Sequence, residues 1–251
     1  MQSGNPTLNK NIFLDAASGT VFSHTDQAMT LNGTVNKTGL MLLLVVIGAM
    51  FSWSQFTGPA SLPAIGPLVL GGALVGFVLA LVTVFKQKWA PVTAPLYALC
   101  EGVFIGALSA IFEMRYPGIV MQAVGLTFGT MAAMLLAYRS GLIRATDKFK
   151  LGVVAATGGI MILYLASFVA GFFGHSFGFI NGSSTIGIVF SLAVVVIAAL
   201  NLILDFDMIE QGVGAGAPKY MEWYGAFALT VTLVWLYLEM LRLLSKLQSR
   251  N

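Results

Sequence analysis

Residues 185–206 read TIGIVFSLAVVVIAALNLILDF, and this stretch decides the fold class of the chain. It is apolar over about 20 residues, the length that an α-helix needs to cross roughly 30 Å of hydrocarbon. It lacks the alternation of apolar and polar residues that is typical of a strand in a membrane barrel. Because backbone N–H and C=O groups in lipid need internal partners, we expect a membrane-spanning helix here.

Six further runs of the same kind predict an all-α membrane protein, a bundle of about seven transmembrane helices. The expected spans are 39–56, 65–85, 92–112, 119–138, 151–173, 185–206 and 223–244. We expect the polar residues 1–36 to form a cytoplasmic N-terminal tail and residues 37–251 to form the seven-helix domain.

Glycine positions add two local predictions. Small residues four apart let helix backbones approach closely, so the pairs Gly72/Gly76 and Gly102/Gly106 predict close helix–helix contacts. A second group predicts a turn after the sixth span, which we expect to end at about residue 206, with Asp205 and Asp207 at its end. The residues of this group are Gly212, Gly214, Gly216 and Pro218.

Composition agrees with a membrane protein and excludes several other classes. Charged residues make up 9% of the chain and hydrophobic residues 57%, whereas a soluble domain carries roughly 25% charged residues. The lipid bilayer is therefore the expected main partner. The net charge is +3, and the basic residues lie at the ends of the spans rather than in patches with aromatic residues, which argues against nucleic-acid binding. The single cysteine, Cys100, excludes an internal disulfide and a thiolate cluster.

Basic residues also predict the orientation. The loop after the second span holds two and the loop after the fourth holds four, namely Lys86, Lys88, Arg139, Arg144, Lys148 and Lys150. The loops near residues 60 and 178 hold none. Since Lys and Arg stay on the cytoplasmic side, we expect a cytoplasmic N-terminus. Seven spans then place the C-terminus outside, although Arg242, Lys246 and Arg250 favour the opposite side.

Ionisable residues inside the spans are the candidate functional residues, because each costs at least ~2.5 kcal/mol at the centre of a bilayer. Glu101 lies in the middle of the third span. Asn201 and Asp205 are one helical turn apart and share a face, so with Glu101 they could form a buried polar cluster. We expect Asp207, at the end of the same helix, to be solvated. Two further residues, Glu239 and Arg242, have the i,i+3 spacing of a structural ion pair.

Buried carboxylates suit two kinds of chemistry. Burial disfavours the charged form of a carboxyl group and a neighbouring carboxylate does so further, so such a site titrates closer to neutral pH. The same oxygen atoms are ligands for Ca²⁺. We therefore expect protons and Ca²⁺ to compete at Asp205 and Glu101, with Ca²⁺ as a bound or permeant ion and no other cofactor.

Enzyme motifs are missing from the sequence. There is no HExxH pair, no Gly-x-Ser-x-Gly elbow and no phosphate-binding Gly-x-x-x-x-Gly-Lys loop. His24 lies in the polar tail and His175 in a predicted loop, each without a convincing partner. We expect the chain not to be an enzyme.

Several stretches of the sequence carry a family resemblance. Two of them are LCEGVFIGALS at residues 99–109 and PKYMEWYGAF at residues 218–227. The others are Ser3–Pro6, Met29–Gly39, Tyr116–Val120, Arg144–Phe149 and Leu236–Leu244. Together they resemble the bacterial branch of the Bax inhibitor-1 family, and the resemblance covers nearly the whole chain.

The resemblance implies a seven-helix fold whose last helix is central, in the bacterial inner membrane. It also implies a pH-sensitive Ca²⁺ leak in which two aspartates, one on each of the last two helices, form a pH-sensing latch. Asp205 matches the first aspartate. The position expected for the second falls near Thr232, which is not acidic, so the latch departs from the family pattern.

Two hypotheses of function follow. The first is a pH-sensitive cation leak, for Ca²⁺, with Asp205 as gate, Glu101 along the path and Asp207 as a further candidate. The second is a scaffold that does not conduct and that restrains a partner, such as a membrane protease, through the N-terminal tail. The resemblance implies both, since relatives are thought to modulate membrane-protein quality control.

Overall fold

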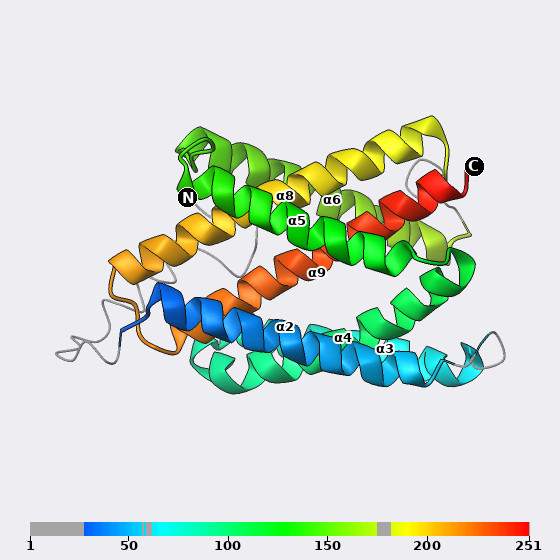
Figure 1. Ribbon diagram of the computed structural model, residues 1–251, viewed down its shortest axis with the longest axis horizontal. Helices are drawn as coiled ribbons and strands as arrows, with labels where there is room; N and C mark the ends of the chain where they lie inside the picture. Colours follow the sequence, from blue (N-terminus) through cyan, green and yellow to red (C-terminus); the bar gives the residue numbers. More distant parts are fainter. Residues whose placement is uncertain (1–27, 57, 59–61, 175–181, 251) are drawn as a thin grey trace. The chain divides into compact units, whose positions relative to one another are not determined.

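The computed structural model describes residues 28–56, 58, 62–174 and 182–250 (Figure 1). Within them, seven helices are long and apolar enough to cross a membrane, so the predicted all-α fold class is confirmed. These helices are α2 (Leu31–Ser54), α3 (Leu62–Phe85), α4 (Ala90–Arg115), α5 (Ile119–Arg139), α6 (Asp147–Phe172), α8 (Thr185–Gly214) and α9 (Met221–Gln248). A short 3-10 helix, η3 (Gln87–Trp89), joins α3 to α4.

The first span begins earlier than expected. Thr30 caps α2, since its Oγ1 accepts a hydrogen bond from the N–H of Gly33 at 3.0 Å. A threonine at this position stabilises a helix start by satisfying one of its free N–H groups. Residues 31–36, which we assigned to the polar tail, are therefore the first residues of α2. Residues 1–27 of that tail lie outside the described residues.

The sixth span ends later than expected. Helix α8 continues through Gly212 to Gly214, and the chain turns at Gly216, whose φ is +67°. A glycine inside a helix costs only about 1 kcal/mol relative to alanine, so two of them do not end this one. Asp205 and Asp207 therefore lie well inside α8, and their predicted place at the end of the helix was wrong.

The chain forms two compact units. In the first, the α2–α4 unit, helices α2, α3 and α4 pack with residues Met208–Val231. In the second, the α5–α6 unit, helices α5 and α6 pack with the first part of α8, up to Asp207, and the last part of α9, from Thr232. Helices α8 and α9 thus contribute one segment to each unit.

Glycines bring α4 against α2 in the α2–α4 unit. A side chain at Gly102 would meet the backbone of Val45, and one at Gly106 would meet the backbone of Ala49. Both pairs run in the same direction along the two helices, so α2 and α4 are parallel and begin at the same end of the unit. The close contact predicted for Gly102 and Gly106 is confirmed.

The second glycine pair lies on α3 and faces α4. A side chain at Gly72 would lie 3.0 Å from the carbonyl oxygen of Cys100. One at Gly76 would lie 3.3 Å from Oε2 of Glu101. A hydrogen bond of 2.7 Å from the Thr83 hydroxyl to Oγ1 of Thr93 joins α3 and α4 as well. Helix α4 therefore packs between two helices whose backbones approach it closely.

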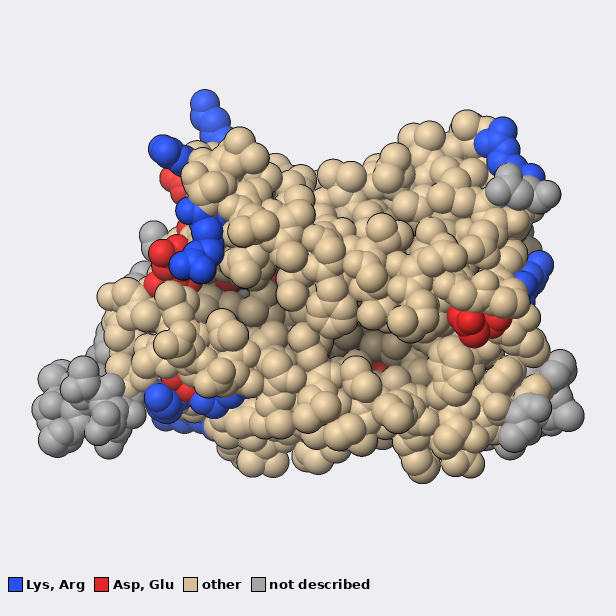
Figure 2. Space-filling model, viewed as in Figure 1, with Lys and Arg blue, Asp and Glu red and all other residues tan. Residues whose placement is uncertain are grey.

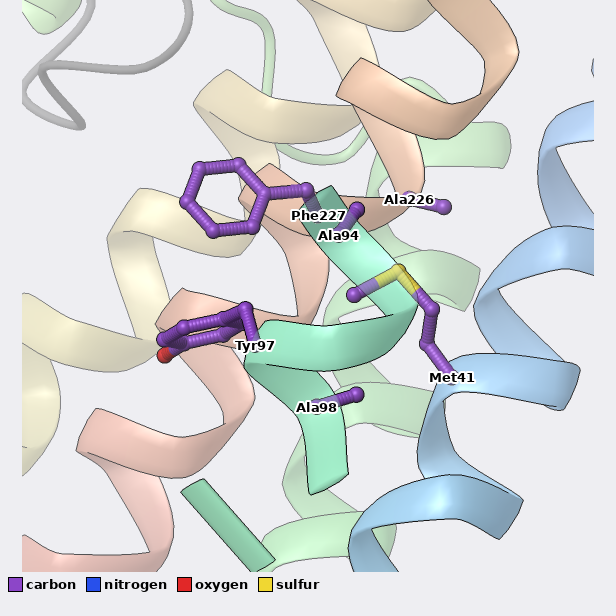
Figure 3. Close-up of a cluster of buried hydrophobic side chains, with 6 residues drawn as sticks. All are labelled: Met41, Ala94, Tyr97, Ala98, Ala226 and Phe227. Carbon is purple, nitrogen blue, oxygen red and sulfur yellow. The ribbon is translucent and has the colours of Figure 1, made fainter. Parts of the chain in front are cut away.

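The apolar core of this unit includes the start of α9 (Figure 3). The rings of Tyr97 on α4 and Phe227 on α9 meet edge to face, with centroids 4.9 Å apart. The other buried members of the cluster are Met41, Ala94, Ala98 and Ala226. Of the seven candidate spans α9 is the most buried, with 67% of its most apolar window inside the protein.

Candidate functional site

Asp205 is a fully buried carboxyl inside an apolar helix, with an exposed fraction of 0%. Asn201, one turn earlier on α8, is 1% exposed. Its side-chain N–H groups donate to Oγ1 of Thr157 on α6 at 2.8 Å and to the carbonyl oxygen of Ile197 at 2.9 Å. The amide oxygen Oδ1 of Asn201 has no hydrogen-bond partner within the described part of the chain. The α5–α6 unit therefore holds a buried carboxyl and a buried amide on one helix face.

Glu101 lies half-buried on α4, in the α2–α4 unit. Within the described ranges it makes neither a hydrogen bond nor an ion pair. Its carboxylate lies beside Gly76 of α3, where the missing side chain leaves room for it. Asp205 belongs to the other unit, so a contact between these two carboxyl groups stays a prediction.

Asp207 forms an ion pair with Lys150 of α6. The side chains are 18% and 12% exposed, respectively. We expected Asp207 to be solvated at the end of its helix. Since α8 continues beyond it, the carboxylate instead lies largely buried against α6 and is neutralised there.

Glu239 and Arg242 pair on α9 as their spacing predicts. Oε1 of Glu239 accepts from Nη1 of Arg242 at 2.8 Å and from the hydroxyl of Tyr164 on α6 at 3.0 Å. Arg242 also donates to the Tyr164 hydroxyl, and its guanidinium lies 4.9 Å from the centre of that ring. Glu239 is 2% exposed. This carboxylate is therefore held by a cation and a phenol and joins α6 to α9.

Thr232, at the position where the resemblance implies a second aspartate, is 2% exposed on α9. It belongs to the α5–α6 unit, as Asp205 does. A threonine carries no titratable group, so this position does not supply the second aspartate that the resemblance implies.

Sequence reasoning missed one buried carboxylate. Glu222, in the first turn of α9, is fully buried. Its Oε1 accepts the N–H and the hydroxyl of Thr30 at 2.9 and 2.8 Å, and it pairs with Lys37 and Lys219. An acidic residue in a first helical turn is ordinarily a solvated partner of the helix dipole. No spacing signal within α9 indicates the partners on α2.

Sequence reasoning also missed the place of Lys246. Its ammonium donates to Oγ of Ser191 at 2.8 Å and to the carbonyl oxygen of Gly187 at 3.0 Å, both on α8. The residue is 5% exposed. Lys246 thus packs inside the α5–α6 unit, although its place near the C-terminus suggested a surface charge.

The arrangement as a whole separates two kinds of carboxyl group. Asp207, Glu222 and Glu239 each pair with a lysine or an arginine. Glu101 has no such pair among the described residues, and Asp205 lies one turn from the Asn201 amide in an apolar helix. In the described ranges no three His, Cys, Asp or Glu side chains gather as a group that could hold a metal ion.

A family model described as Bax inhibitor 1 like matches residues 5–249. The chain belongs to the Bax inhibitor 1-like family. A comparison with curated proteins finds no match. With its seven candidate spans, this Bax inhibitor 1-like chain is a multi-pass membrane protein. The bacterial inner membrane and the cytoplasmic N-terminus stay predictions.

Proposed function

We propose that this protein is a pH-sensitive cation leak, for Ca²⁺, in which Asp205 is the titrating residue. The observation that carries the proposal is the complete burial of the Asp205 carboxyl in α8, one turn from the buried amide of Asn201. Membership of the Bax inhibitor 1-like family supports a membrane role for such a group.

The physical argument rests on what a buried carboxyl can do. In its charged form it carries a high desolvation cost, which a proton or a bound cation removes. Protonation leaves Asp205 neutral, whereas loss of the proton creates a negative charge that attracts a cation. The affinity of an ion path along Asp205 for cations therefore changes over the pH range in which this one carboxyl group titrates.

Glu101 is the second group that this proposal uses. Its carboxylate is half-buried among apolar residues and lies beside Gly76. We place it along the path of the ion rather than at the gate. Replacing Glu101 with glutamine is expected to reduce the rate of flux and to leave its pH dependence in place.

The test is Ca²⁺ flux into liposomes that hold the purified protein, measured from about pH 5 to 8. The matched variants are Asp205→Asn and Asp147→Asn, which make the same chemical change at a buried and at an exposed carboxyl of the α5–α6 unit. We expect Asp205→Asn to remove the pH dependence and Asp147→Asn to preserve it. Absence of flux at every pH, or equal profiles for both variants, contradicts the proposal.

One structural observation favours a scaffold as the alternative. The N–H of Met29 donates to the carbonyl oxygen of Ala217 at 2.6 Å, and Thr30 binds Glu222. The residues directly before α2 are thus hydrogen-bonded to the residues around the start of α9. A partner that binds the N-terminal tail could therefore act on α9. Deleting residues 1–27, which spares these contacts, separates the two functions: a leak still conducts, whereas a scaffold loses its partner.

A further inference from the structure

We propose that the turn between α3 and α4 binds the headgroups of anionic lipids. The turn reads Phe85-Lys86-Gln87-Lys88-Trp89, and four of these five residues are exposed. Phe85 is 75% and Trp89 61% exposed. Tryptophan is enriched at the ends of membrane spans, at the level of the lipid headgroups, so we expect Trp89 and the two lysines beside it to lie there.

The backbone holds this turn in one conformation. The N–H of Trp89 donates to the carbonyl oxygen of Lys86 at 2.8 Å. The side-chain amide of Gln87 donates to the carbonyl oxygen of Val84 at 3.0 Å. Lys86 and Lys88 therefore extend from a fixed frame between the two aromatic residues, and headgroup binding does not have to order a loose loop.

The two lysines of the turn have no acidic partner among the described residues. Because α2 and α4 are parallel, the turn lies at the same end as Lys37 and Glu222, where blue side chains gather in Figure 2. The Glu222 carboxylate is already engaged by Lys37 and Lys219. Lys86 and Lys88 form no ion pair with any described residue, so they are available to an external anion.

Two lysines and two exposed aromatic rings together match a phospholipid that has an anionic headgroup and acyl chains, rather than a free anion.

The test uses Trp89 as a fluorescent reporter in vesicles that contain the full-length protein. Brominated phosphatidylglycerol and brominated phosphatidylcholine are compared as quenchers at equal mole fraction. We expect stronger quenching by the anionic lipid, and we expect this excess to disappear in Trp89→Phe. Added salt should reduce the excess, because screening weakens surface attraction.

Charge variants decide whether the lysines cause the preference. We expect Lys86→Gln and Lys88→Gln each to lower the relative affinity for phosphatidylglycerol about fivefold, since one surface lysine contributes about 1 kcal/mol. The matched control is Arg115→Gln at the opposite end of α4, which should leave the preference unchanged. Equal quenching by both lipids, a preference that survives the double lysine variant, or its loss on adding inorganic phosphate at constant ionic strength would overturn the proposal.

Discussion

The carboxylate of Glu222 occupies the space where a side chain at Gly33 would lie. Glu222 begins α9, and Gly33 lies in the first turn of α2. Thr30 links the two, because its hydroxyl donates to Glu222 and accepts from the N–H of Gly33. The carboxylate of Glu222 thus connects the first turns of two helices, α2 and α9, that are far apart in the sequence.

Gly33→Ala is expected to destabilise the protein. The new methyl group would collide with the Glu222 carboxylate, and such overpacking costs about 1–3 kcal/mol. The control is Gly39→Ala on the same helix, where nothing lies within 4 Å of the added carbon. That change should be neutral or stabilising by up to about 1 kcal/mol, because alanine favours a helix. Unfolding of both variants in mixed detergent micelles measures the difference.

Glu222→Gln should lower the free energy of unfolding by about 1–3 kcal/mol. Glutamine can still accept a hydrogen bond from Thr30, but it leaves Lys37 without its counter-charge. Lys219→Gln is the control, since that side chain is 51% exposed and an exposed pair contributes less than about 1 kcal/mol. Equal losses in the two variants would mean that the charge on Glu222 is not what holds α2 to α9.

Gly102→Ala tests the contact between α2 and α4. The added carbon would meet the backbone of Val45, which cannot move aside as a flexible side chain can. We expect a loss of about 1–3 kcal/mol and a lower midpoint of thermal aggregation in detergent. Gly129→Ala, on the exposed side of α5 with nothing within 4 Å, is the matched control. If both variants unfold alike, close backbone approach does not stabilise this pair.

The sequence predicted the helices and the α2–α4 contacts because both depend on local signals. Hydrophobic length alone identifies a span, and glycines four apart mark a close approach. The end of α8 was misplaced, because Gly212 and Gly214 resemble a turn but are tolerated inside a long helix. Nothing in the local sequence distinguishes those two possibilities.

The partners of buried charges could not be predicted in the same way. Glu239 and Arg242 lie on one helix, so their spacing was sufficient. Glu222 and Lys37 are 185 positions apart in the sequence and lie on different helices. The rotation of each helix about its axis decides which side chains meet. Lys246 bears on the predicted orientation in the membrane. Because it donates hydrogen bonds inside the α5–α6 unit, its charge is weaker evidence that the C-terminus lies on the cytoplasmic side.

Tyr164→Phe tests the polar link between α6 and α9. The change removes the hydroxyl that donates to Glu239 and accepts from Arg242. A hydrogen bond between membrane helices contributes about 1 kcal/mol, so we expect a loss of that size. Tyr116→Phe removes the same atom from a tyrosine whose hydroxyl has no partner among the described residues, and it should have no effect. A double-mutant cycle with Glu239→Gln measures the coupling directly.

Asp207→Asn tests whether Asp207, which is paired with Lys150, has any role in the pH dependence of the proposed flux. Lys150 already supplies the counter-charge of this carboxylate, so Asp207 offers a permeant cation no uncompensated charge. Under the proposed function, Asp207→Asn should therefore leave the pH profile of Ca²⁺ flux unchanged, while it lowers stability by about 1 kcal/mol through loss of a largely buried pair. Asp205→Asn, two residues earlier on α8, should flatten that profile. If Asp207→Asn flattens it instead, the ion pair between α6 and α8 controls the flux, and the role proposed for Asp205 is wrong.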